Sequence, residues 1–319
     1  MQKKLPPTTP DALNPPAKNY TFFENVSDHA FQPNDTALNL RNAWWLMEAA
    51  LLSYSSFADV DKHFNTAGLN ATIKHFDGKT STQAYVASSN EWIVLAFRGT
   101  QVDDFWASVI DWGVDAQFFP VHDSHFNLVH AGFLAAVREV WRDIAAYVAD
   151  LQHQQARPLW IVGHSLGAAL ATLAANLCSD QPSQLGLKGL YTFGSPRVGD
   201  AGFAARISCS VRRFRNNSDL VTHVPLGLVF RHVGELELID AAGHAHLGLG
   251  GTDKLFLETM TVHLSPAEAH TMSRLLQMSG GGTPLPGFLA DHAPINYAIR
   301  TWNCYEAGLV NSPPNIVRT

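Results

Sequence analysis

Several features are scarce or missing in this chain of 319 residues, and each absence excludes a class of protein. The three cysteines, Cys178, Cys209 and Cys304, are too far apart for a zinc motif or a disulfide framework. Charged residues make up only 16% of the chain, and acidic residues outnumber basic ones, which gives a net charge of −6. A protein that binds a nucleic-acid backbone needs an extended positive surface. We therefore expect no nucleic-acid partner.

Long apolar runs are missing as well, and with them the usual marks of membrane insertion and export. No run approaches the roughly 18 apolar residues of a membrane-spanning helix, so we expect no transmembrane segment. After Lys3 and Lys4 the chain turns to proline and threonine rather than to an apolar stretch, so no signal peptide is visible. The compartment stays open between secretion and the cytoplasm, and so does the oligomeric state.

What is present is the composition of a folded protein, with 46% hydrophobic residues. Residues 1–36, rich in Pro, Asn and Thr, are expected to form an extended arm. Residues 37–319 show no internal repeat and no linker between two cores, so we expect them to form a single domain.

Short apolar runs alternate with helical patterns along this domain. Residues 92–97 form a continuous apolar run, as a strand buried on both faces requires, and residues 38–54 have the spacing of an amphipathic helix. Further strands are predicted at 159–162, 190–193 and 211–214, and a strand or hairpin at 229–240. Further helices are predicted at 133–151, 166–177, 201–207 and 265–278, and a glycine-rich loop at 241–251. The alternation favours an α/β fold with a mostly parallel central sheet flanked by helices.

The segment with the clearest chemistry is Gly163-His164-Ser165-Leu166-Gly167, between a buried strand pattern and a helix rich in Ala and Leu. A serine on a sharp strand-to-helix turn presents its hydroxyl to a substrate, and larger side chains two positions before and after it would collide. The start of the following helix also directs free backbone N–H groups toward a developing oxyanion. The pattern predicts Ser165 as a nucleophile and the amide of Leu166 as one oxyanion donor.

A serine nucleophile needs a histidine base, and a carboxylate that orients this base. In hydrolases with this turn, the acid and then the histidine follow the serine along the chain. Asp219 comes after the strand at 211–214 and a polar turn, where the acid is expected. Asp200 is the alternative, although its place before the helix at 201–207 favours a role as a helix cap.

Four stretches in this order make the chain resemble the class 3 lipases, the fungal-lipase type of α/β-hydrolase. They are Leu95–Thr100, Val129–Phe133, Gly163–Gly167 and Thr192–Gly199. The similar region covers about residues 40–240, with a weaker end near residue 292. The resemblance implies an α/β-hydrolase fold with a lid, and it supports Asp219, because the family carries its acid in an Asn-x-x-Asp-x-Val-like stretch before a proline.

The base is expected to be His292, since the pair Asp291-His292 resembles the late Asp-His segment of this family. In many relatives a tyrosine follows the histidine more closely, whereas here Tyr297 comes five residues later, around Pro294. The alternative base is His263.

The same resemblance implies two features after the strand at 92–97. Thr100 would be the second oxyanion donor, and the segment after it would carry a short lid helix over the acyl site. The alternative is a helix that packs permanently on the core. The apolar stripe of this helix consists of Phe105, Trp106, Val109, Ile110 and Trp112.

The sequence thus predicts a serine carboxylic-ester hydrolase, a lipase that acts on acylglycerols at a lipid–water interface and needs no metal or organic cofactor. The alternatives are an esterase for short-chain or feruloyl esters and a phospholipase A. A catalytically silent binding protein with the hydrolase fold is the alternative from another class. The complete set of Ser165, Asp219 and His292 argues against silence.

Overall fold

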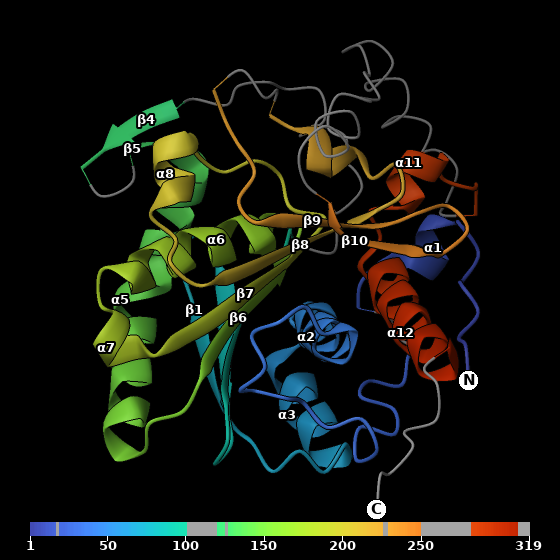
Figure 1. Cartoon of the computed structure of the whole chain (residues 1–319), viewed down its shortest axis with the longest axis horizontal. Coiled ribbons are helices and arrows are strands. Elements are labelled where there is room, and N and C mark those ends of the chain that lie inside the picture. The colour runs from blue at the N-terminus through green and yellow to red at the C-terminus, as the bar shows by residue number, and fades with distance from the viewer. Residues whose placement is uncertain (17–18, 101–119, 125–126, 226–228, 250–281, 312–319) are drawn as a thin grey trace, which may run out of the picture.

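The structure, a computed structural model, describes residues 1–16, 19–100, 120–124, 127–225, 229–249 and 282–311. Within these residues a sheet of eight strands forms the centre of the molecule (Figure 1). Its strands are β1 (Thr72–Asp77), β2 (Gln83–Ser88), β3 (Ile93–Phe97), β6 (Leu159–His164), β7 (Leu187–Phe193), β8 (Ser210–Asn216), β9 (Glu235–Ile239) and β10 (Ala245–Leu249). They lie in the sheet in the order in which they follow one another along the chain. A separate small sheet pairs β4 (Pro120–Asp123) with β5 (Asn127–His130).

Strands β3, β6, β7, β8 and β9 run parallel to one another. At the two edges, β2 pairs antiparallel with β3 and with β1, and β10 pairs antiparallel with β9. Every residue of β3 and β6 is buried, as in a sheet covered on both faces. The carboxyl ends of parallel strands meet at one edge of the sheet, where ligands bind in open α/β folds. Ser165 follows β6 and Asp219 follows β8 at this edge.

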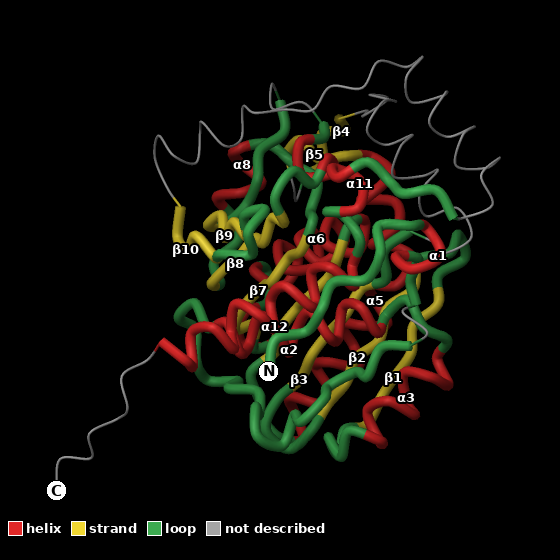
Figure 2. Tube along the Cα trace, turned by 90° about the vertical axis from the view of Figure 1, so that its right-hand side faces the viewer, coloured by secondary structure: helices red, strands yellow, loops and turns green. Residues whose placement is uncertain are grey.

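Helices cover the two faces of the sheet (Figures 1 and 2). One core forms under α5 (Ala131–Gln154) and α6 (Leu166–Ser179), and the other under α2 (Leu40–Leu52) and α12 (Pro294–Asn311). The side chains of β3 alternate between these two cores. The remaining helices are short, apart from α3 (Phe57–Thr66): α1 (Pro10–Leu13), α7 (Pro182–Leu185), α8 (Ala201–Ala205), α11 (Gly287–Ala290) and a 3₁₀ turn (Leu220–His223). The predicted α/β-hydrolase arrangement is confirmed.

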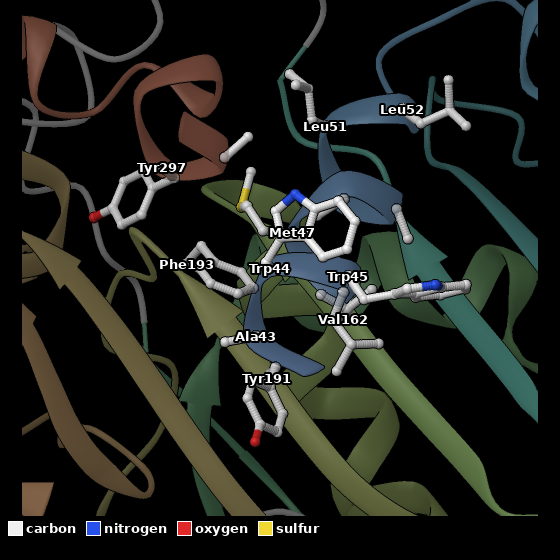
Figure 3. Close-up of a cluster of buried hydrophobic side chains, with 14 of the residues drawn as sticks. Ala43, Trp44, Trp45, Met47, Leu51, Leu52, Val162, Tyr191, Phe193 and Tyr297 are labelled. Atoms are coloured by element: carbon white, nitrogen blue, oxygen red, sulfur yellow. The ribbon is translucent and has the colours of Figure 1, made fainter. Parts of the chain in front are cut away.

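Helix α2 is buried on nearly all sides, which fits its almost wholly apolar sequence. Figure 3 shows Trp44 and Trp45 of this helix beside Val162 of β6 and Phe193 of β7. On its other side, Trp44 packs against Trp302 of α12, with ring centroids 4.8 Å apart. Helix α2 therefore lies between the sheet and α12 and fixes the distance between them.

The N-terminal residues are tied to the same layer. Phe23 is buried, and its backbone N–H donates to the buried carboxylate of Glu48 at 3.0 Å. The indole of Trp44 and the hydroxyl of Tyr20 donate to this carboxylate as well. The expected arm is therefore anchored on the core and carries the short helix α1. The boundary between arm and domain at residue 36 stays a prediction.

The elements differ from the sequence prediction in several places. The expected glycine-rich loop at 241–251 contains β10, which pairs with β9. The sequence patterns do not predict the hairpin of β1 and β2, the pair of β4 and β5, or the helices α3 and α12. The helix predicted at 265–278 lies outside the described residues. Among the described helices, none has both the length and the apolar character needed to cross a membrane.

Candidate active site

The serine turn has the geometry that its sequence predicts. Ser165 joins β6 to α6 with a φ of 58° and a ψ of −127°, a strained conformation for a residue with a side chain. Its backbone N–H donates to the carbonyl of Phe193 at 3.0 Å, which holds the turn against β7. A Cβ atom at Gly163 would collide with the backbone of Gly167, and one at Gly167 would collide with the carbonyl of Phe97. Both glycines are therefore required for the close approach of the helix to the sheet.

The structure brings the three predicted polar residues into one hydrogen-bonded chain. His292, in the turn between α11 and α12, places Nε2 at 2.9 Å from Oγ of Ser165. Its Nδ1 lies 2.9 Å from both carboxylate oxygens of Asp219. All three side chains are buried. In the sequence, Ser165 lies 127 positions and Asp219 lies 73 positions before His292.

The carboxylate of Asp219 accepts two further hydrogen bonds. Val221 donates its backbone N–H to Oδ1 at 2.9 Å, and Tyr297 donates its hydroxyl to Oδ2 at 2.6 Å. Burial alone would raise the pKa of Asp219, but the neighbouring His292 and the hydrogen bonds from His292 and Tyr297 outweigh it, so the pKa lies below its usual value. Asp219 is therefore held as the ionised partner of the imidazole.

Tyr297 is a site residue with only a weak sequence signal, because it lies farther from the histidine than the tyrosine of many relatives does. Helix α12 begins at Pro294, so Tyr297 lies in its first turn and its hydroxyl returns to Asp219. The same hydroxyl accepts the backbone N–H of Asn216 at 2.9 Å. Burial, followed by the charge of Asp219, raises the pKa of Tyr297, which keeps the hydroxyl protonated as a donor.

Besides the contact between Asp219 and His292, a second set of hydrogen bonds joins the loop that carries the acid to the turn that carries the base. Asp291 accepts hydrogen bonds from the side chain of Asn217 at 2.9 Å and from the backbone N–H of Ser218 at 3.2 Å. The side-chain amide of Asn216 donates to the backbone carbonyl of Asp291 at 2.9 Å. Burial raises the pKa of Asp291. This contact fixes the end of β8 against the turn that holds His292.

The expected oxyanion donors lie at the same edge of the sheet. Leu166 is the first residue of α6, where backbone N–H groups have no partner within the helix. Thr100 is half-buried and lies three residues beyond β3, whose last carbonyl lies against Gly167 at the start of α6. The alternative acid, Asp200, instead caps α8 by accepting the N–H of Phe203 at 2.8 Å.

Some predicted residues fall outside the described part of the chain. They are the alternative base His263 and the expected lid residues Phe105, Trp106, Val109, Ile110 and Trp112. Within the described residues, no group of three or more His, Cys, Asp or Glu side chains is arranged to hold a metal ion.

Comparisons with known proteins give the same family as the motifs. Residues 94–228 match the family model described as lipase (class 3). A lipase of Rhizomucor miehei is 34% identical over 165 residues, which are 48% of this chain and 44% of that protein. A secreted mono- and diacylglycerol lipase A of Penicillium cyclopium is 36% identical over 159 residues, 46% of this chain and 48% of that protein. The matched region thus spans about half the length of these relatives.

The likeness in structure extends further than the likeness in sequence. The solved structure of Rhizomucor miehei triacylglyceride lipase superimposes with a TM-score of 0.60 at 26% identity. The superposition covers 72% of this chain and 92% of that one. The chain is thus similar to the class 3 lipases in sequence over residues 94–228 and in structure over 72% of its length.

Proposed function

We propose that this protein is a serine carboxylic-ester hydrolase that acts on acylglycerols. The observation that carries the proposal is the buried chain of hydrogen bonds from Ser165 through His292 to Asp219. The names of the relatives, a triacylglyceride lipase and a mono- and diacylglycerol lipase, support acylglycerols as the substrate.

The proposed reaction uses each residue for one task. Oγ of Ser165 attacks the ester carbonyl carbon while Nε2 of His292 takes the hydroxyl proton. Asp219 keeps the proton of the ring on Nδ1 and stabilises the imidazolium that forms. The N–H groups of Leu166 and Thr100 bind the oxyanion of the tetrahedral intermediate.

Collapse of this intermediate breaks the bond to the alcohol, which leaves with the proton from His292. Water then attacks the acyl-enzyme, His292 accepts its proton, and the carboxylic acid is released with Ser165 restored. The segment 101–115 is proposed to cover the acyl site as a lid, with its apolar stripe turned toward that site in water. We further propose that residues 37–319 form one domain.

The proposal is tested with a serine-directed alkyl phosphonate, read by the mass of the intact protein and of its peptides. One label on Ser165 is expected, and none in Ser165→Ala. Absence of a label in the wild-type chain would contradict the proposal and favour the silent binding protein.

A series of p-nitrophenyl esters from short to long chains, with feruloyl, triacylglycerol and phospholipid substrates beside it, separates the three hydrolase activities. The proposal expects the highest kcat/KM on acylglycerols. A preference for short or feruloyl esters would identify an esterase, and a preference for phospholipids would identify a phospholipase A.

A further inference from the structure

A second buried histidine lies directly behind the proposed base and takes no part in the reaction above. His164, the last residue of β6, is fully buried. Its Nε2 lies 2.9 Å from the backbone carbonyl oxygen of His292, and its Nδ1 lies 2.9 Å from the hydroxyl of Tyr54. Tyr54 follows α2, so this chain of contacts joins α2, β6 and the turn that holds His292.

The direction of these hydrogen bonds follows from the groups involved. A carbonyl oxygen only accepts, so Nε2 of His164 must carry a proton and donate to His292. In a neutral imidazole the other nitrogen then has a lone pair, and the hydroxyl of Tyr54 donates to it. Tyr54 thereby selects the tautomer of His164 that can bind the carbonyl of His292.

The surroundings of His164 keep its ring neutral. Burial is the main cause that lowers the pKa of His164, and the nearby His292, whose ring centroid is 4.7 Å away, lowers it further. Asp219 acts in the opposite direction. The other facing groups, Tyr54 and Tyr297, stay protonated because burial raises their pKa values.

This inference rests on the proposed function. We propose that Tyr54 and His164 are positioning residues for the base, which hold the backbone of His292 so that its ring stays between Ser165 and Asp219. The amide N–H of His292 bonds to the carbonyl of Leu289 at 2.9 Å, and the donor on His164 fixes the carbonyl side of the same residue. His164 hydrogen-bonds to the backbone carbonyl of His292, whereas the ring nitrogens of His292 bind Asp219 and Ser165, so we expect the loss of either positioning residue to affect the reaction step rather than substrate binding.

The test begins with variants that remove or keep single donors. Tyr54→Phe removes the hydroxyl alone, and kcat on a soluble p-nitrophenyl ester should fall by about tenfold with KM unchanged, the effect of one buried hydrogen bond. His164→Leu should lower kcat by at least as much. His164→Gln retains an amide N–H in place of Nε2 and should keep kcat within about threefold of the wild-type value.

The matched control is Tyr85→Phe, which removes another buried tyrosine hydroxyl that donates to a backbone carbonyl, that of Ala49 at 2.7 Å. It should lower stability to a similar extent and leave kcat unchanged. If Tyr54→Phe lowers kcat no more than Tyr85→Phe does, the proposal is wrong. If Tyr54→Phe lowers kcat as strongly in the His164→Leu background as in the wild type, Tyr54 does not act through His164, and the proposal is also wrong.

A spectroscopic measurement separates this inference from the proposed function. The ring ¹⁵N shifts of His164, assigned by comparison with His164→Gln, should show the Nε2–H tautomer in the wild-type chain and a change in Tyr54→Phe. The Nδ1–H tautomer in the wild type would overturn the inference even where the enzyme is active. Failure of the phosphonate to label Ser165 would overturn the proposed function and, with it, the role of the pair in positioning a base.

Discussion

Tyr297→Phe should destabilise this protein far more than the loss of one hydroxyl group suggests. The hydroxyl donates to the ionised carboxylate of Asp219 at 2.6 Å and accepts the N–H of Asn216 at 2.9 Å. A hydrogen bond to a charged group contributes about 1.5–3 kcal/mol, and a buried N–H left without a partner costs about 1–3 kcal/mol. We expect a loss of about 3–5 kcal/mol in the free energy of unfolding.

Tyr85→Phe is the reference for this prediction. The hydroxyl of Tyr85 donates to the carbonyl of Ala49, which also accepts the N–H of Ser53 at 3.2 Å and so keeps a partner when the hydroxyl is lost. The expected cost is therefore about 1 kcal/mol. Urea unfolding followed by tryptophan fluorescence at pH 7 measures both variants, with unchanged slopes showing that the comparison is valid. Equal losses in Tyr297→Phe and Tyr85→Phe would refute the reasoning.

The pH dependence gives a second check on the same pair. The pKa of Asp219 is lowered in the folded protein, so the group contributes stability above its pKa in the unfolded chain, and this stability is lost as the pH falls through the folded value. The loss in the free energy of unfolding caused by Tyr297→Phe should become smaller as the pH falls and Asp219 is protonated, because part of this loss depends on the charged carboxylate. A difference between wild type and variant that stays constant as the pH falls would mean that Tyr297 does not act on the ionised form.

Three further predictions concern the acid, the Asp291 carboxylate beside the base, and the expected lid. Asp219→Asn should lower kcat by up to about 10⁴-fold, since an amide presents the wrong partner to the imidazole, while Asp200→Asn leaves kcat nearly unchanged; the reverse result would move the acid. Burial raises the pKa of Asp291, so its charged form opposes folding and stability falls as the pH rises through the folded pKa. Asp291→Asn, which keeps an accepting oxygen, should match or exceed wild-type stability at pH 7 in urea unfolding, whereas Asp291→Ala should lower it. Replacing Trp106 and Val109 by Ser should reduce hydrolysis of emulsions more than of soluble esters, and equal reductions would indicate a fixed helix.

The sequence predicts best the strands that are buried on both faces of the sheet. Strand β3 and the first four residues of β6 are short continuous apolar runs, as expected for strands that are buried on both faces. Strand β1 buries only Phe76, so its composition does not distinguish it from a loop. The glycines of residues 241–251 predict a loop where the structure has β10. Gly248 has a φ of +66° and lies where the pairing of β10 with β9 shifts register.

Some residues of the candidate site are marked by a local sequence motif, whereas others are brought together only by the fold. Ser165 was predictable because a strand, two glycines and a helix within a few residues define its turn. Asp219 and His292 required the chain order of the fold and the resemblance to a family. The contacts of Tyr297 with Asp219 and of Tyr54 with His164 join residues 78 and 110 positions apart, and no local pattern marks such pairs. They arise from the way α2 and α12 pack.

The strained turn at Ser165 has a consequence for how the sequence changes over evolutionary time. A φ of 58° with a ψ of −127° suits glycine, so Ser165→Gly would relieve backbone strain of about 1–3 kcal/mol while it removed the proposed nucleophile. Mutation and selection for stability alone would therefore drive this position toward glycine. If the proposed function holds, a lineage keeps serine here only while hydrolysis contributes to fitness, so a serine on this strained turn indicates that the reaction is still under selection.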